Sequence, residues 1–212
     1  MTQPAGGLLS IVMSDNNKIK TNLIDVADCV LVLVDVQKVF ADKLTDLEKQ
    51  KVVERIGWIV DVARKLDVPI VAMGEDIESN GGVIEEIKSK LPEDQVIHNK
   101  MVFGLAGEKA ILKDINCTGK NCVILAGFET DVCVAQSAIG LLDYRFSVAV
   151  LADGTASPGE GHANGLRRMM QAGVLITDLK SLYYEWMRTV AADDAFKSNF
   201  LDEIETPDGL IL

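Results

Sequence analysis

The hydrophobic residues of this chain form two kinds of segment that alternate along the sequence. Short runs of consecutive apolar residues predict strands that are buried on both faces, as in a parallel sheet. Such runs occupy Cys29–Val34, Val68–Met73, Val96–Ile97, Cys122–Ala126, Phe146–Ala152 and Val174–Ile176. Between them, apolar residues recur at the three- to four-residue spacing of amphipathic helices. The alternation predicts an α/β fold, a three-layer, doubly wound sheet of about six mainly parallel strands with helices on both faces.

The helical patterns differ in strength. The strongest begins at Asp46 and continues to about Leu66, with an apolar stripe that includes Val52, Ile56 and Ile59. The other expected helices are Val83–Leu91, Gly107–Ile115, a helix capped by Thr130 or Asp131 that continues to about Leu142, His162–Ala172, Leu179–Val190 and Asp194–Ile204. Gly173 is expected to end one of these helices. Residues 74–82 (GEDIESNGG) are expected to form a loop.

No linker, repeat or low-complexity tract divides the sequence, so we expect one domain over residues 25–212. Residues 1–24 fit neither pattern and are expected to form an N-terminal arm. The arm contains a short apolar patch, Gly7–Met13, without positive residues before it, which argues against a signal peptide. Together with Tyr183, Tyr184 and Trp186, this patch gives apolar surface that a monomer would leave exposed, so we expect a homo-oligomer.

The composition argues against two classes of binding partner, nucleic acid and membranes. The 212 residues include 21 basic and 32 acidic residues, a formal net charge of −11. No basic stripe with interleaved aromatic residues occurs, so neither nucleic acid nor membrane is an expected partner. No apolar run is long enough to span a bilayer. The four cysteines form no CxxC pair, which favours free thiols in a reducing, cytoplasmic setting over disulfides.

Three chemically active side chains stand at the ends of predicted strands: Asp35, Lys100 and Cys133. The carboxyl ends of parallel strands meet at one edge of a sheet, so these residues are expected to converge there. Each has a simpler explanation when taken alone. Asp35 could cap a helix, Lys100 could be a solvated surface charge, and Cys133 could be a small core residue. Together they supply the proton acceptor, positive charge and nucleophile of a cysteine hydrolase.

The segments around these residues resemble the isochorismatase-like cysteine hydrolase family. The resemblance rests on LVLVDVQKVF around Asp35, HNKMVFG around Lys100 and ILAGFETDVCVAQSA around Cys133, and it covers about residues 25–182. ADGTAS at Asp153 resembles the next strand end of the family. The resemblance implies a Rossmann-like α/β fold in which Cys133 is the nucleophile, Asp35 is the general base toward the thiol, and Lys100 is the electrostatic partner.

The resemblance also implies an oxyanion hole formed by the backbone N–H groups of Glu129 and Cys133, and a cis peptide bond between Phe128 and Glu129. The residues themselves predict a lowered pKa for the Cys133 thiol, because a helix N-terminus and Lys100 both stabilise negative charge. Asp35 opposes this effect, and one proton shared over a coupled Cys133–Asp35 pair is the alternative. We expect Cys133 to be alkylated faster at pH 7 than the other three cysteines.

Nicotinamidases of this family carry an Asp/His/His metal site just after the second strand. The corresponding segment here, residues 73–82 (MGEDIESNGG), lacks histidine, and the chain contains only His98 and His162. We therefore expect no metal and no other cofactor, and the chain resembles the family branch without an assigned substrate rather than a nicotinamidase. Glu75, Asp76 and Glu78 could form an acidic rim facing the substrate, but a solvated loop is the simpler interpretation.

Three further residues are candidates for the substrate pocket. Gln37 follows Asp35 by two positions and would point to the same side of an extended backbone, with a purely structural hydrogen bond as the alternative. Phe40 and Phe103 lie shortly after Asp35 and Lys100, and they could wall a small apolar pocket or belong to the core. Asp153 is expected to fix its loop without taking part in catalysis.

These features predict a metal-independent cysteine hydrolase that cleaves a C–N bond of a small amide, carbamoyl or ureido compound through a covalent acyl-enzyme. The alternatives are an isochorismatase-type vinyl ether hydrolase and a non-catalytic binding or scaffold protein with the same fold. The intact set of Asp35, Lys100 and Cys133 favours an enzyme. The sequence leaves the substrate open, because specificity belongs to loops such as residues 74–82 and 155–161.

Overall fold

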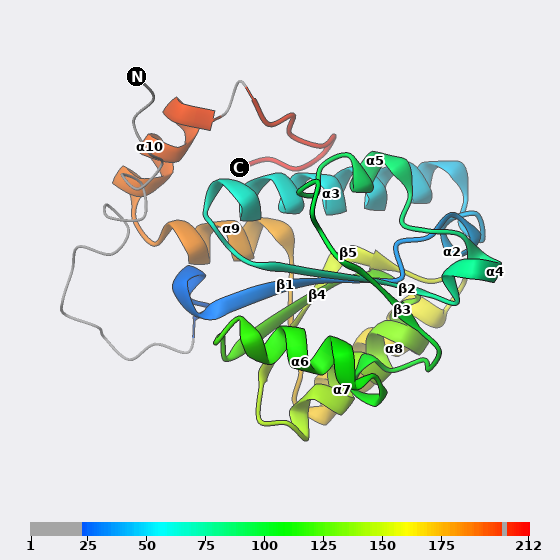
Figure 1. Ribbon diagram of the computed structural model, residues 1–212. Helices are drawn as coiled ribbons and strands as arrows, with labels where there is room; N and C mark the ends of the chain where they lie inside the picture. The colour runs from blue at the N-terminus through cyan, green and yellow to red at the C-terminus, as the bar shows by residue number, and fades with distance from the viewer. Residues whose placement is uncertain (1–22, 201–202) are drawn as a thin grey trace.

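A six-stranded parallel sheet forms the centre of the protein (Figure 1). The computed structural model describes residues 23–200 and 203–212. The strands are β1 (Cys29–Val34), β2 (Ile70–Glu75), β3 (Ile97–Lys100), β4 (Cys122–Phe128), β5 (Ser147–Ala156) and β6 (Leu175–Thr177). They lie in the order β3-β2-β1-β4-β5-β6, and each neighbouring pair is parallel. The predicted doubly wound α/β fold is therefore confirmed.

The strand order reverses beside β1. The chain proceeds outward from β1 to β2 and β3, and then crosses back to place β4 on the other side of β1. Ligands of open α/β sheets bind at the carboxyl ends of the strands where the order reverses in this way. The residues that follow β1 and β4 therefore stand at the position that the fold favours for a binding site.

Helices cover both faces of the sheet (Figure 1). One face carries α3, α5 and α9, and the opposite face carries α6, α7 and α8. The longer helices are α3 (Asp46–Lys65), α6 (Lys109–Cys117), α7 (Ala135–Leu142), α8 (Gly161–Ala172), α9 (Leu179–Met187) and α10 (Val190–Phe200). The short ones are α2 (Lys38–Ala41), α4 (Ile77–Asn80), α5 (Glu85–Lys88), the 3₁₀ turns η1 (Val26–Asp28) and η2 (Leu105–Gly107), and the π-helical turn η3 (Thr130–Val134).

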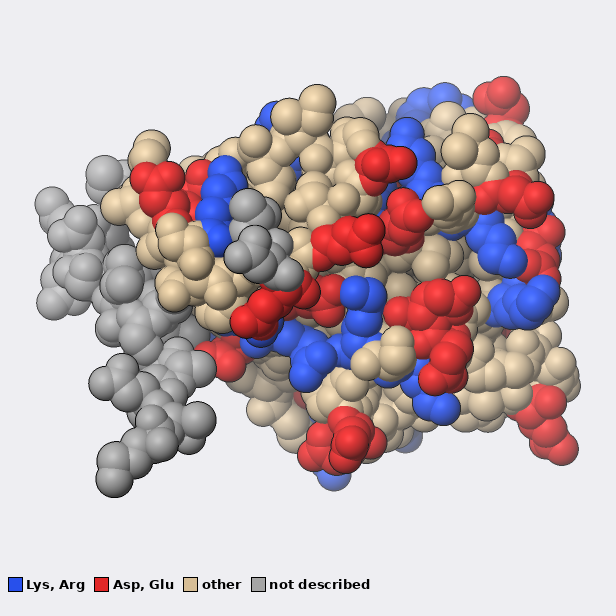
Figure 2. Space-filling view, turned by 90° about the horizontal axis from the view of Figure 1, so that it is seen from above, with Lys and Arg blue, Asp and Glu red and all other residues tan. Residues whose placement is uncertain are grey.

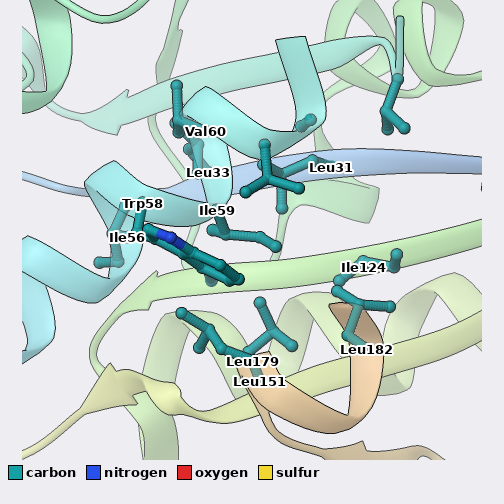
Figure 3. Close-up of a cluster of buried hydrophobic side chains, with 14 of the residues drawn as sticks. Leu31, Leu33, Ile56, Trp58, Ile59, Val60, Ile124, Leu151, Leu179 and Leu182 are labelled. Carbon is teal, nitrogen blue, oxygen red and sulfur yellow. The ribbon is translucent and has the colours of Figure 1, made fainter. Parts of the chain in front are cut away.

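Two hydrophobic cores lie on either side of the sheet. All six residues of β1 are buried, and they alternate between the cores: Leu31 and Leu33 face α3 and α9, whereas Val30, Val32 and Val34 face the opposite layer. Figure 3 shows Leu31 and Leu33 in one cluster with residues of α3, β4, β5 and α9. Burial on both sides explains why β1 and β4 appear in the sequence as continuous apolar runs.

Several predicted boundaries shift. β2 begins at Ile70 instead of Val68 and continues to Glu75, because its last residues pair with β3. The segment expected to be a loop, residues 74–82, therefore supplies the end of β2 and the short helix α4. The last helix begins at Val190 instead of Asp194. The predicted N-terminal arm, apart from its last two residues, lies outside the described residues.

Figure 2 shows the face that carries α3 and α5, where acidic and basic side chains of the described residues are interspersed. Each helix in the described ranges is too short or too polar to cross a membrane.

Candidate active site

Asp35, Lys100 and Cys133 converge at the carboxyl edge of the sheet. Asp35 directly follows β1, Lys100 is the last residue of β3, and Cys133 lies in η3 after β4. All three are buried, with Asp35 and Lys100 fully enclosed and Cys133 2% exposed. Asp35 has a left-handed backbone with φ 49°, a strained conformation that concentrates at functional sites. The strands thus bring together the residues that the sequence singled out.

Lys100 is the centre of positive charge in this group. Its Nζ lies 2.9 Å from Asp35 Oδ2, and it also donates to the backbone oxygens of Val102 and Phe103, at 2.7 and 3.0 Å. The interpretation of Lys100 as a solvated surface charge is wrong, because its side chain is completely enclosed. A buried ammonium of this kind is stable only with a charge partner and further acceptors, and Lys100 has both.

Glu75 is a fourth member of the site that the sequence analysis placed in a solvated loop. The Cys133 Sγ donates to Glu75 Oε2 at 3.1 Å, and the same oxygen lies 3.5 Å from Lys100 Nζ. The reason is the strand order: β2 lies between β1 and β3, so the Lys100 side chain must pass the end of β2 to reach Asp35. The order of the strands was the missing signal, because it brings Glu75, the last residue of β2, between Lys100 and Asp35.

Burial controls the pKa values at this site. It raises the pKa of Asp35 from its ordinary value of 3.8 to about 6, against the opposing effect of Lys100. Burial also raises the pKa of the Cys133 thiol, and the neighbouring Asp35 adds to this rise, while Lys100 counteracts it. The expected lowering of the thiol pKa is therefore wrong. This shift favours the protonated thiol, and the faster alkylation of Cys133 stays a prediction, with the exposed Cys117 as its main competitor.

The backbone around Cys133 also differs from the expected cap. Thr130 and Asp131 begin a π-helical turn, and their side chains bind elsewhere instead of capping the helix. Thr130 Oγ1 lies 2.9 Å from His162 Nδ1, and Asp131 Oδ1 accepts a 2.6 Å hydrogen bond from Ser157. These bonds tie the turn that carries Cys133 to α8 and to the end of β5.

Close backbone contact brings β4 beside β1 just before this turn. Gly127 has φ 130°, and a Cβ at this position would lie 1.9 Å from the Val34 carbonyl oxygen, so only glycine fits. The peptide bond between Phe128 and Glu129 is cis. The Glu129 carboxylate pairs with Lys43 at 3.0 Å.

The three pocket candidates have different surroundings. Gln37 is fully buried, and its amide donates to the backbone oxygens of Glu75 and Gly81 and accepts from the Glu75 N–H at 2.7 Å. The amide is thus occupied in positioning Glu75, as the structural alternative expects, and a contact of Gln37 with substrate stays a prediction. Phe40 is buried in the core on the α3 face. Phe103 is 56% exposed, and its backbone oxygen holds Lys100.

Asp153 has the structural role expected of it. It accepts a hydrogen bond from the Leu179 N–H at 2.9 Å, which anchors the start of α9, and it faces Arg55 at 3.5 Å. A cavity of about 360 Å³ lies beside it at the carboxyl end of β5, with Thr155, Ser157 and His162 in its lining. A second groove, of about 680 Å³, lies between α3 and α5, and its lining includes none of Asp35, Lys100 and Cys133.

One group among the described residues has the donor atoms for a metal ion. Oxygen atoms of Asp35 and Glu75 and the sulfur of Cys133 lie within 4.8 Å of one another. Lys100 already lies beside both carboxylates and neutralises part of their charge. The protein thus supplies its own cation at the point where these donors converge.

The comparisons with known proteins agree with this geometry. A family model described as the isochorismatase domain matches residues 29–181. The chain belongs to the isochorismatase family. The secreted isochorismatase effector Isc1 of Phytophthora sojae is 31% identical over 173 residues, which are 80% of this chain and 81% of Isc1. The probable hydrolase YcaC of Escherichia coli is 27% identical over 152 residues, 71% of this chain and 73% of YcaC.

The solved structures show the same fold. The crystal structure of the Escherichia coli YcaC gene product, described as an octameric hydrolase of unknown specificity, superposes with a TM-score of 0.76 at 24% identity. The alignment covers 87% of this chain and 93% of that chain. Family membership and these relatives identify the chain as an isochorismatase-family hydrolase at a general level.

Proposed function

We propose that the chain is a metal-independent cysteine hydrolase that cleaves a C–N bond of a small amide, carbamoyl or ureido compound. Cys133 is the nucleophile, and the reaction passes through a covalent acyl-enzyme. The observation that carries the proposal is the enclosed Lys100–Asp35 ion pair, 2.9 Å long, beside the buried thiol of Cys133. A scaffold protein gains little from such a pair, since enclosed charges cost free energy unless they are fully compensated.

The chemistry begins with a neutral thiol. As Sγ attacks the carbonyl carbon, a carboxylate must accept its proton, because the thiol would otherwise remain a weak nucleophile. The resemblance assigns this step to Asp35, whose raised pKa of about 6 suits a base that works near neutral pH. Lys100 stabilises the negative charge that passes between sulfur and carboxylate. The backbone N–H groups of Glu129 and Cys133 are the proposed donors to the oxyanion.

The second half of the reaction releases both products and restores the free thiol of Cys133. The C–N bond breaks, the leaving nitrogen takes the proton, and a thioester remains on Cys133. Water then attacks the thioester, and its proton returns to the thiol through the carboxylate. Among the pocket candidates, the exposed ring of Phe103 remains as a proposed contact for the substrate.

The decisive experiment is a hydrolysis screen with simple amides, N-carbamoyl amino acids and ureido acids. We expect turnover of at least one class, with mass spectrometry showing an acyl adduct on Cys133. Cys133→Ala is the variant that should abolish both, and Cys117→Ala is its control because Cys117 is an exposed cysteine at the end of α6, which leads into the start of β4. Hydrolysis that survives in Cys133→Ala would refute the proposal.

We also propose that the protein is a homo-oligomer. Apolar residues next to Lys100 support this, since Met101 and Phe103 are 64% and 56% exposed. Surface of this kind often lies at subunit contacts. Light scattering at micromolar concentration should give a multiple of the 23.0 kDa chain mass. A monomer mass over that range would contradict the proposal.

The cytoplasmic setting is likewise proposed. All four cysteines are unpaired, as suits a reducing compartment. Cell fractionation that recovers the protein outside such a compartment would contradict this assignment.

A further inference from the structure

We infer that the cavity at the carboxyl end of β5 is a second binding site, which takes a small organic carboxylate and stabilises the turn that carries Cys133. This β5 cavity has a volume of about 360 Å³ and is lined by residues in and around α3, β5 and the start of α8. Its lining includes none of Asp35, Lys100 and Cys133. Binding there does not depend on the proposed hydrolase activity.

The sheet is irregular where the β5 cavity lies. β4 and β5 pair in register as far as Leu125 and Val150, and they pair again at Gly127 and Thr155. Residues 151–154 of β5 therefore stand opposite a single residue of β4. Irregularities of this kind redirect side chains and are common beside binding sites. Here Thr155, directly after the irregular stretch, contributes to the wall of the cavity.

Two buried polar atoms in the lining lack a hydrogen-bond partner. Arg55 Nε and Thr155 Oγ1 are both enclosed, and neither has a partner among the described residues. Thr155 as a whole is 3% exposed. Nearly all buried polar groups in proteins are hydrogen-bonded. Both of these groups can donate, so the cavity calls for an acceptor that the described part of the chain does not supply.

The charged groups of the lining favour a carboxylate as that acceptor. Arg55 and Lys51 bring positive charge, and Glu48 and Asp153 bring negative charge. Both carboxylates already have donors. Glu48 accepts from the backbone N–H and hydroxyl of the residue that caps α3, and Asp153 accepts from the first N–H of α9 and faces a terminal nitrogen of Arg55. The Nε edge of Arg55 remains, and such an edge can bind both oxygens of a carboxylate.

The rest of the lining fits the body of a small organic acid. Leu44, Val52, Ala152 and Ala156 contribute apolar surface beside the polar groups. The volume lies at the lower end of the range that small-molecule sites occupy. An inorganic anion would use the polar groups but leave the apolar surface uncovered. A carboxylic acid with a short hydrocarbon chain is therefore the class of ligand that fits both parts.

The lining is bonded directly to the segment that carries Cys133. Thr155 pairs with Gly127 near the end of β4. His162, which also lines the cavity, has its Nδ1 2.9 Å from Thr130 Oγ1 in η3. A ligand that fixes these lining residues therefore also restrains the backbone on both sides of Glu129. The site is thus placed to regulate the turn of Cys133 without touching the reacting atoms.

The test uses the full chain with sodium butyrate as the probe. Sodium chloride at equal ionic strength and 1-butanol are the controls for salt and for the hydrocarbon chain. An NMR titration measures binding, and hydrogen-exchange mass spectrometry follows residues 127–134. Arg55→Lys and Thr155→Val remove the two unpaired donors. Arg64→Lys is the matched control, because Arg64 belongs to the same helix but lies outside the lining.

We expect saturable binding of butyrate and slower hydrogen exchange in residues 127–134. Arg55→Lys should weaken binding about tenfold, because lysine keeps the charge but cannot bind both oxygens in the same way. Thr155→Val should weaken it several-fold, and Arg64→Lys should bind as the wild type does. Without ligand, Thr155→Val should unfold at a higher temperature, since a buried hydroxyl without a partner is gone. Its loss of binding then cannot be assigned to misfolding.

Three results would overturn the inference. Butyrate that perturbs the spectrum no more than chloride or 1-butanol would show that no carboxylate site exists. Equal affinity in the wild type, Arg55→Lys and Thr155→Val would place the ligand elsewhere, for example beside Lys100. Saturable binding without slower exchange in residues 127–134 would remove the link to the turn of Cys133. Each of these results leaves the hydrolysis screen with Cys133→Ala unaffected, so failure here is distinct from failure of the proposed function.

Discussion

Cysteines lie at both ends of the strand pair β1 and β4, with Cys29 and Cys133 buried and Cys122 half-buried, and the surroundings of these thiols differ. At the amino end, Cys29 and Cys122 are partners in the strand register. At the carboxyl end, Cys133 follows β4 by one turn. Burial raises the thiol pKa at both ends, to about 12 for Cys29 and Cys122. A low resting pKa therefore does not distinguish the candidate nucleophile from its structural counterparts.

The hydrogen-bond acceptor of each thiol does distinguish them. Cys29 Sγ donates to the Val26 backbone oxygen at 3.6 Å, and a peptide carbonyl cannot take the proton. Cys133 Sγ donates to a carboxylate at 3.1 Å, with an enclosed ammonium nearby. Reactivity at this site depends on a base that removes the proton during the reaction, in the manner of serine hydrolases, and not on a thiolate formed in advance.

The largest expected effect comes from Lys100→Met. Loss of the ammonium leaves Asp35 enclosed without its partner, which we expect to cost about 3–5 kcal/mol of unfolding free energy. Turnover of the substrate found in the screen should fall about 1,000-fold, because the charge transferred during attack is no longer stabilised. Denaturant unfolding and steady-state kinetics measure the two effects.

Lys120→Met is the matched control at the other end of the strands. Lys120 Nζ also donates to a backbone oxygen, that of Ala27 at 2.7 Å, but it lies near Cys29 instead of Cys133. Its replacement should leave turnover within about twofold of the wild type. Equal losses of turnover in Lys100→Met and Lys120→Met would show that the carboxyl end of the strands has no special role in turnover.

The pH dependence gives the next largest effect. Turnover requires ionised Asp35, so it should fall about tenfold for each pH unit below the Asp35 pKa of about 6. The stability contribution of this group has the opposite sign. Its folded-state pKa exceeds 3.8, so its contribution is fully present below pH 3.8 and is lost as the pH rises through about 6.

A pH–rate profile and denaturant titrations at several pH values check this pair of trends. Asp35→Asn should flatten the part of the stability profile that changes between about pH 4 and 6. A turnover limb centred well above or below pH 6 would assign the titration to another group.

A smaller effect is expected from Cys29→Ala. Cys29 is fully buried in the core on the α3 face, so removal of its sulfur should lower the unfolding free energy by about 1 kcal/mol. Turnover should be unchanged, in contrast to its loss in Cys133→Ala. Kinetics and denaturant unfolding on the same preparation separate the two roles, and a loss of turnover in folded Cys29→Ala would contradict them.

No effect is expected from metal chelation. Prolonged dialysis against EDTA should leave turnover intact, because Lys100 supplies the positive charge beside both carboxylates. Zinc-dependent recovery of activity after chelation would show that the cluster of Asp35, Glu75 and Cys133 holds an ion in the working enzyme.

The sequence was sufficient to predict the fold because each strand and helix has its own pattern of apolar residues. The continuous apolar run of β1 and the stripe of α3 each follow from burial within one element, and Thr45 with Glu48 forms a capping box where α3 begins. Asp35, Lys100 and Cys133 could be placed because each lies at or shortly after the end of such a run. The resemblance then added their roles.

Glu75 and the thiol pKa were not predictable in this way. Both depend on which strands are neighbours and on how completely the side chains are enclosed. β2 lies between β1 and β3, and its last residue is Glu75, which the sequence pattern assigns to a loop. The strand order therefore places Glu75 where it accepts the hydrogen bond of Cys133. Likewise, the sign of the thiol pKa shift follows from enclosure, which outweighs the nearby positive charge.

The way Lys100 is held also affects how new specificities could arise. Its ammonium is anchored on the carbonyl oxygens of Val102 and Phe103, while their side chains, like that of Met101, are exposed. Every amino acid supplies a carbonyl oxygen, so side chains in this segment can be exchanged without removing the anchor. Evolution, or a designed library, could therefore vary the side chains of residues 101–103 beside the candidate site while the Lys100 ammonium stays in place.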